Sequence, residues 1–109
     1  MIVVCITMNA LPEKNLELLQ TLASLIGPTE NETGCWSYTI ACDIQDENCF
    51  NLLQKWDTRK GLDHHIGSQR FGVLLGSKGL LCEPPQIQIH TVSRSEGMEA
   101  IHAVRDIRS

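Results

Sequence analysis

The feature that most constrains this chain is the order in which strand-like and helix-like segments follow one another. Residues 2–8 form an unbroken apolar run rich in β-branched side chains, which predicts a strand buried on both faces. Residues 34–44 alternate with a period of two and predict a strand. After the polar turn 45–48, residues 49–56 predict a third strand that forms an antiparallel hairpin with it. Residues 86–92 alternate again and predict a fourth strand.

Helical spacing of apolar residues fills the two long gaps between these strands. Residues 12–26 predict a helix that ends at the glycine-proline pair 27–28, because glycine permits a left-handed cap and proline cannot continue a helix. The polar residues 29–33 are then expected to form a loop. A second helical region begins at Thr58, a good N-cap residue, and is interrupted by the glycine-serine pair 67–68.

The resulting order of strand, helix, strand, strand, helix and strand is the βαββαβ pattern of the ferredoxin-like α+β fold. In that fold, helices cover one face of a four-stranded antiparallel sheet. Because residues 2–8 and 34–44 carry apolar or aromatic side chains at both parities, we expect the second face to need cover as well. A second copy packed sheet against sheet, giving a dimeric α/β barrel, is the simplest cover.

The domain organisation follows from the same reading. Residues 1–95 are predicted to form the ferredoxin-like domain, and residues 96–109 are predicted to form a tail. Within that tail, residues 96–107 carry apolar side chains at three-residue spacing, which predicts a short amphipathic C-terminal helix.

Composition excludes several classes of partner and compartment. The net charge is -4, and the 9 lysines and arginines are scattered, which argues against a nucleic-acid partner. The 5 cysteines are odd in number and contain no CxxC pair. Without a secretion signal or a run long enough to cross a bilayer, we expect a reduced, cytoplasmic protein with no membrane partner.

An ordered set of residues resembles the antibiotic biosynthesis monooxygenase domain family. The usual run of that family is GCxxY, an acidic residue before the hairpin, FxxxExW and then LxxHxxSxxF. The matching residues here are Gly34, Cys35, Tyr38, Asp43, Phe50, Trp56, Leu62, His65, Ser68 and Phe71. The resemblance covers about residues 2–92. It implies a ferredoxin-like fold, an obligate dimeric barrel and a pocket between each sheet and its helices.

The resemblance also implies oxygenation of a small aromatic or quinone-like molecule without a metal or flavin cofactor. The chain departs from the family run at positions that bear on this chemistry. The glutamate of FxxxExW is Gln54, an amide that cannot act as a base. In the quinone-forming, cofactor-free monooxygenases the tryptophan corresponds to Trp56, whereas their asparagine and tyrosine correspond to Leu52 and Leu62.

His65 is the candidate general base, since imidazole gains and loses a proton near neutral pH. Trp56 offers an indole N–H to a substrate oxygen. Asn9 matches an asparagine used by the heme-degrading branch of the family, although the axial histidine of that branch is Leu75 here. The predicted catalytic residues are therefore His65 and Trp56. The residues predicted to bind substrate are Asn9, Tyr38, Gln54, Leu52, Leu62 and Phe71.

Structural explanations stay open for the same residues. His65 can be a histidine bonded to backbone, Trp56 can anchor the third strand, and Asn9 can bond local backbone. A binding or sensing module without turnover is a second hypothesis, and an isomerase of a small carbonyl compound is a third. His64 and His65 are adjacent and point about 100° apart on a helix, so no metal site is predicted.

Overall fold

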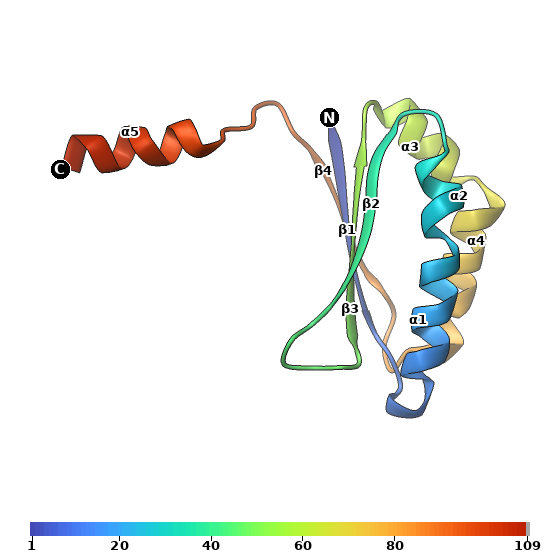
Figure 1. Cartoon of the computed structure of the whole chain (residues 1–109). Helices are drawn as coiled ribbons and strands as arrows, with labels where there is room; N and C mark the ends of the chain where they lie inside the picture. The colour runs from blue at the N-terminus through green and yellow to red at the C-terminus, as the bar shows by residue number, and fades with distance from the viewer. Residues whose placement is uncertain (109) are drawn as a thin grey trace.

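The computed structural model describes residues 1–108 and shows helices layered on one face of a four-stranded antiparallel sheet (Figure 1). The strands are β1 (Ile2–Asn9), β2 (Cys35–Cys42), β3 (Cys49–Trp56) and β4 (Gln86–Thr91). Their order in the sheet is β2-β3-β1-β4, with β1 antiparallel to both of its neighbours. The predicted ferredoxin-like fold is confirmed, and within the single chain the sheet is open rather than closed into a barrel.

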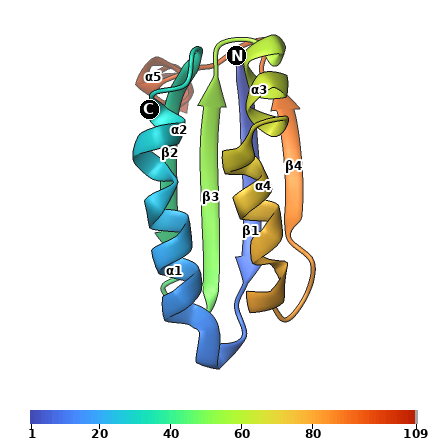
Figure 2. The ribbon, with the colours of Figure 1, turned by 90° about the vertical axis from the view of Figure 1, so that its right-hand side faces the viewer.

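The helices occupy the two crossover connections and the tail. The first connection holds a 3-10 turn η1 (Pro12–Lys14), α1 (Asn15–Ser24) and α2 (Ile26–Glu30). The second holds α3 (Arg59–Ile66), α4 (Gln69–Gly76) and a 3-10 turn η2 (Ser77–Leu80), and the tail forms α5 (Met98–Arg108). Seen from the helix side, α1 and α2 lie over β2, whereas α3 and α4 lie towards β1 and β4 (Figure 2).

The predicted end of the first helix at residues 27–28 is wrong. The backbone N–H of Leu25 donates to the carbonyl of Leu22, three residues back, so α1 ends in a tightened turn. α2 then begins at Ile26 and continues through Pro28 to Glu30, into the segment expected to be a loop. Pro28 is the third residue of α2, where backbone N–H groups lack an intrahelical acceptor, so its missing N–H costs no hydrogen bond.

β2 contains a bulge that strict alternation of side chains did not reveal. Cys35 lies opposite Trp56, yet Ser37 lies opposite the residue immediately before Trp56, so β2 carries one extra residue at this point. The alternation of residues 34–44 predicts that Trp36 and Tyr38 lie on one face, and this placement is wrong. Cys35 instead packs against the core beside Tyr38, and the side chain of Trp36 is 58% exposed.

The two faces of the sheet differ more than the sequence pattern predicted. On β1, every second side chain is buried beneath the helices, and those between them are only half-buried within the single chain. The helix-covered residues of β1 are Ile2, Val4, Ile6 and Met8. We call the other face the open face. By register its polar residues include Thr7, Ser37, Thr39, Asn51, Lys55, Gln86, Gln88 and His90.

α3 and α4 begin at side-chain caps that fix how they sit above the sheet. The Thr58 hydroxyl accepts a hydrogen bond from the Gly61 N–H, and the Ser68 hydroxyl accepts one from the Phe71 N–H. These caps set the rotation of each helix. As a result Leu62, His65 and Phe71 point to the covered face of the sheet and are buried.

α5 stands apart from the two layers. In Figure 1 it extends from the end of β4 to the side of the open face, away from the other helices. Its apolar side chains Met98, Ile101 and Val104 recur every three residues and are 64%, 54% and 53% exposed. The predicted amphipathic tail helix is confirmed, with its apolar stripe in solvent within the single chain.

Candidate functional site

Seven of the eight residues predicted for the site lie together on the helix-covered face of the sheet. Tyr38 of β2 is directly opposite Gln54 of β3. Leu62 and His65, three residues apart on α3, lie on one face of that helix. None of the seven is more than 6% exposed. We call them the interior cluster: Tyr38, Leu52, Gln54, Trp56, Leu62, His65 and Phe71.

The eighth residue, Asn9, lies elsewhere. It ends β1 opposite Cys49, at the parity of the open face. Its Nδ2 donates to Oε1 of Glu83 at 2.7 Å, across the chain segment that leads into β4. The structure therefore does not bring Asn9 to His65 or Trp56.

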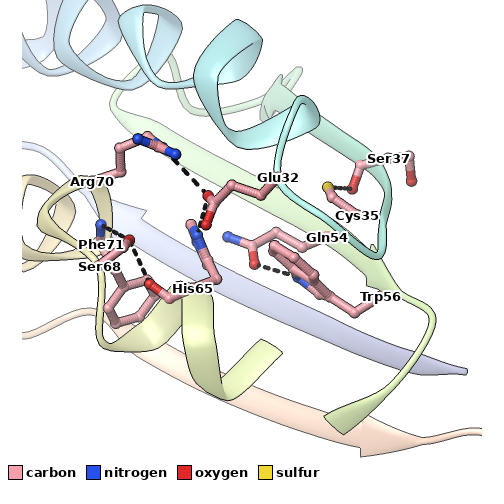
Figure 3. Close-up of polar contacts among 9 residues, drawn as sticks. All are labelled: Glu32, Cys35, Ser37, Gln54, Trp56, His65, Ser68, Arg70 and Phe71. Atoms are coloured by element: carbon pink, nitrogen blue, oxygen red, sulfur yellow. Dashed lines mark hydrogen bonds and ion pairs between the residues drawn. The ribbon is translucent and has the colours of Figure 1, made fainter. Parts of the chain in front are cut away.

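A buried carboxylate that the sequence did not single out, Glu32, is bonded to His65. Its Oε2 accepts a hydrogen bond from Nδ1 of His65 at 2.6 Å and from Nε of Arg70 at 3.4 Å (Figure 3). The side chains of Glu32 and His65 are 6% and 3% exposed, so bulk water and salt screen the pair little. Arg70, which is partly exposed, supplies the opposite charge that a buried carboxylate requires.

This contact decides which nitrogen of His65 is free for chemistry. A carboxylate only accepts hydrogen bonds, so Nδ1 carries the hydrogen in the pair. Within residues 1–108 no side chain or backbone group bonds the other ring nitrogen, Nε2. With Nδ1 held by Glu32, Nε2 is the atom that can accept a proton from a ligand.

Aromatic rings hold the imidazole on its other sides. The ring of His65 stacks on that of Trp56, with centroids 4.9 Å apart and an interplanar angle of 29°. Phe71 meets it edge to face at 5.4 Å and 78°. Because Glu32 fixes one edge and the two rings fix the faces, the imidazole has little freedom to rotate, which is what a positioned base requires.

Two polar atoms of the interior cluster have no partner. The Oε1 of Gln54 accepts from Nε1 of Trp56 at 3.0 Å, but Gln54 Nε2 is buried without a hydrogen bond. The Tyr38 hydroxyl is also buried and unpaired, and burial raises the pKa of Tyr38 to about 12. Leaving a buried polar atom unpaired costs about 1–3 kcal/mol, so each atom is a candidate contact for a ligand or a buried water.

Thiol chemistry is disfavoured at the nearest cysteine. Burial, followed by the negative charges of Glu32 and Glu30, raises the pKa of the Cys35 thiol. The thiolate is the nucleophilic form, and it is scarce when nearby charges are negative. Cys35 therefore acts as a small core residue beside the site.

Two surface hollows approach the interior cluster from opposite ends of β2 and β3. One, the α1 groove, has a volume of about 230 Å³ and lies between α1 and the sheet. Its lining residues are Asn15, Leu16, Leu19, Ile40, Cys42, Glu47 and Phe50. Ile40 of this groove lies directly opposite Leu52 of the cluster. The other hollow, of about 390 Å³, includes Thr33 and His64, the chain neighbours of Glu32 and His65.

Among residues 1–108, no three histidine, cysteine, aspartate or glutamate side chains gather so that they could hold a metal ion. Over the same residues, no helix combines the length and apolar character needed to cross a bilayer.

Comparison with known proteins identifies the family of the chain. Residues 1–74 match the family described as antibiotic biosynthesis monooxygenase. The chain belongs to this family. The match includes β1 to β3, α3 and most of α4, and hence all of the interior cluster together with Glu32 and Arg70. Members of the antibiotic biosynthesis monooxygenase family are usually dimers.

Individual relatives are similar to most of the chain. An uncharacterized protein of Synechocystis is 29% identical over 96 residues, which are 87% of this chain but 65% of the length of that protein. The Bacillus subtilis protein named "Putative monooxygenase YcnE" is 31% identical over 85 residues, 77% of this chain and 90% of that protein. The structure of Rv0793 from Mycobacterium tuberculosis superposes with a TM-score of 0.81 at 23% identity, covering 88% and 98% of the two chains. At that identity the superposition supports the fold alone.

Glu32 is the candidate site residue that the sequence did not reveal. It lies in a short polar loop, 33 residues before His65, and no motif singles it out. The sequence signal that could have indicated it is its position two residues before the GCxxY motif.

Proposed function

We propose that the chain is a monooxygenase-like protein that binds a small aromatic or quinone-type molecule against the interior cluster and oxidises it with O2. The observation that supports this most directly is the Glu32–His65 pair, at 2.6 Å, which leaves Nε2 of a rigidly held imidazole unbonded. Family membership and the name of the Bacillus subtilis relative support the class of reaction.

The proposed chemistry balances with O2 as the only oxidant. A phenol with hydrogen on its para ring carbon gives its O–H proton to Nε2 of His65, and the electron-rich phenolate reacts with O2. One oxygen atom becomes the new quinone carbonyl, and the other leaves as water with the para hydrogen and the returned proton. The substrate loses four electrons and O2 gains four. The buried, water-poor surroundings of Trp56 and Phe71 protect the reactive intermediate.

Access to the cluster is proposed to run through the α1 groove. Its apolar lining suits an aromatic ring, and Ile40 and Phe50 lead along the covered face to Leu52 and then to Tyr38 and Gln54. A shift of α1 away from β2, which is an edge strand, would widen this path without disturbing β1 and β4.

Oxygen uptake tests the proposal. The purified chain is mixed with a panel of dihydroxy-aromatic compounds between pH six and pH nine, and oxygen consumption and quinone absorbance are followed. His65→Gln is expected to lower the rate about 100-fold or more. The matched control is His64→Gln on the exposed side of the same helix, which should leave the rate unchanged. If His65→Gln unfolds the protein, Glu32→Gln replaces it. No oxygen uptake with any compound, or equal rates for the two histidine variants, would overturn the proposal.

A second candidate is a binding or sensing module without turnover. It is favoured by the apolar side chains of Leu52 and Leu62 and by Gln54, none of which can move a proton. A ligand would then raise the melting temperature and be recovered unchanged by mass spectrometry. Recovery of an oxidised ligand would exclude this candidate, and recovery of an isomer would favour the isomerase hypothesis instead.

We also propose that the chain pairs with a second copy through the open face. Family members are usually dimers, the helices leave this face uncovered, and α5 projects on the same side (Figure 1). Light scattering in dilute buffer should give twice the 12.2 kDa chain mass. A stable, folded single subunit would count against pairing.

A cytoplasmic location is proposed because all five cysteines are free thiols.

A further inference from the structure

We infer that Gln54 Nε2 and the Tyr38 hydroxyl form a pair of hydrogen-bond donors for a negatively charged oxygen of the ligand, a phenolate or an enolate. This inference rests on the proposed ligand site at the interior cluster. It goes further by stating which charge state of the ligand the site prefers and which two atoms recognise it.

The direction of the Gln54 amide is fixed by its neighbour. The indole Nε1 of Trp56 can only donate, so the atom that it bonds at 3.0 Å must be the amide oxygen. The NH2 group of Gln54 is thereby turned away from Trp56. In Figure 3 it points to the side of the cluster on which His65 lies. It is fully buried and has no hydrogen-bond partner, so its hydrogens are left for a ligand oxygen on that side of the cluster.

Tyr38 supplies the second donor from the neighbouring strand. It is directly opposite Gln54 in the β2–β3 ladder, so the two side chains leave the same face of the sheet side by side. Its hydroxyl is buried and unpaired. Because burial raises the pKa of Tyr38 to about 12, the hydroxyl keeps its hydrogen at every pH at which the protein would be assayed.

Two donors without an acceptor favour an anionic oxygen over a neutral one. Hydrogen bonds to a charged oxygen are roughly twice as strong as those to a neutral oxygen. The buried negative charge of Glu32 does not oppose the ligand fully, since His65 and Arg70 both bond its Oε2. The resembled family run has a glutamate at position 54. A carboxylate there would repel the anion, whereas the amide of this chain donates to it.

His65 and the pair of donors would have different roles in the proposed reaction. His65 would take the proton from the phenol through Nε2, and Gln54 with Tyr38 would hold the oxygen anion that remains. Stabilising developing charge with donors that are already in place is the most effective use of buried polar groups in an active site.

The test uses para-nitrophenol, whose phenolate is yellow and whose neutral form is not, so binding and ionisation are read together. With the unaltered chain, the bound probe should ionise at a pH about one unit lower than the free probe, which corresponds to about tenfold tighter binding of the anion. Gln54→Glu should weaken phenolate binding about tenfold or more. Gln54→Met and Tyr38→Phe should each weaken it about fivefold.

The matched control is Gln88→Glu, which adds the same charge on the open face of β4 and should change binding less than about twofold. Circular dichroism checks that each variant folds, and Gln54→Met keeps the test valid if Gln54→Glu does not. Equal effects of the two glutamate variants, absence of probe binding, or equally tight binding of neutral para-nitroanisole would overturn the inference.

The outcome is separable from that of the proposed function. Preferential phenolate binding without oxygen uptake would support the donor pair and refute the oxygenase. Oxygen uptake that Gln54→Met and Tyr38→Phe leave unchanged, with no shift in probe ionisation, would do the reverse.

Discussion

The two faces of the sheet differ in how far their side chains are buried within a single chain. On the covered face, Trp56, Gln54 and His65 are at most 2% exposed and contact one another through rings and hydrogen bonds. On the open face, Gln86, Gln88 and His90 of β4 are exposed, and α5 reaches into solvent. The covered face carries the buried candidate site. The open face stays in contact with solvent within the single chain.

α5, on the side of the open face, has an apolar stripe that is exposed to solvent within the single chain. A helix of eleven residues is marginal by itself in water, because nucleation is costly and no tertiary packing offsets it. Its stripe of Met98, Ile101 and Val104 would gain stability only against another apolar surface. The difference between the faces therefore predicts that mutations inside act on folding and chemistry, while changes outside act on association.

Replacing the interior tryptophan should give the largest effect. Trp56→Ala removes a fully buried ring that stacks on His65, and it is expected to lower the free energy of unfolding by about 4 kcal/mol. Trp36→Ala, the matched change at the exposed bulge, should change it by less than about 1 kcal/mol. Urea unfolding followed by circular dichroism measures both. Similar losses for the two variants would erase the distinction between inside and outside.

Removing the buried carboxylate should come next. Glu32→Ala leaves His65 and Arg70 without their partner, and we expect a loss of about 3 kcal/mol in the free energy of unfolding. Asp63→Ala breaks the exposed Arg59–Asp63 pair at 2.8 Å and should cost less than about 0.5 kcal/mol. If the two variants unfold at the same urea concentration, the Glu32 pair is not shielded as described.

Deleting residues 96–109 should separate folding from association. The remaining domain, residues 1–95, is expected to unfold within about 1 kcal/mol of the full chain when both are compared as monomers, because the exposed stripe of α5 buries little within one chain. Dimer dissociation should rise about tenfold or more if α5 packs on the partner, a loss of about 1.4 kcal/mol. Sedimentation over a range of concentrations measures it, and an unchanged dimer would remove α5 from the interface.

The ionisation of Tyr38 should give a smaller but clean effect, because it is the chain's single tyrosine. In the folded chain its pKa is raised to about 12, whereas an exposed tyrosine ionises near pH 10. The neutral side chain thus stabilises the fold below pH 10, and this contribution is lost as the pH rises through about 12. Tyrosinate absorbance checks this in native protein and in urea. Ionisation near pH 10 in the native chain would mean that the hydroxyl reaches water.

The strands were predictable from local sequence, and β3 has the bounds expected from residues 49–56, which follow the polar turn 45–48. Two local features of the backbone were not predicted. Pro28 looks like a helix stop but fits the first turn of α2, and the extra residue at Trp36 reverses the faces of the start of β2. Both depend on hydrogen bonds that the order of residue types does not specify.

The candidate site was predictable only where a motif marked it. His65, Trp56 and Gln54 belong to runs with recognisable spacing, and the fold brings them together. Glu32 joins them through a contact across 33 positions of sequence, which only the packing of the loop after α2 against α3 creates. Asn9 has a suitable side chain and a matching position in the chain, but strand parity turns it to the opposite face.

The bulge in β2 leaves the chain with two indoles in opposite surroundings. Trp36 stands in solvent, where a collisional quencher such as iodide can reach it, while Trp56 is sealed against the ring of His65. Tryptophan fluorescence that iodide does not quench therefore comes from Trp56, next to His65. Events at the site can be watched in the native protein with no label attached.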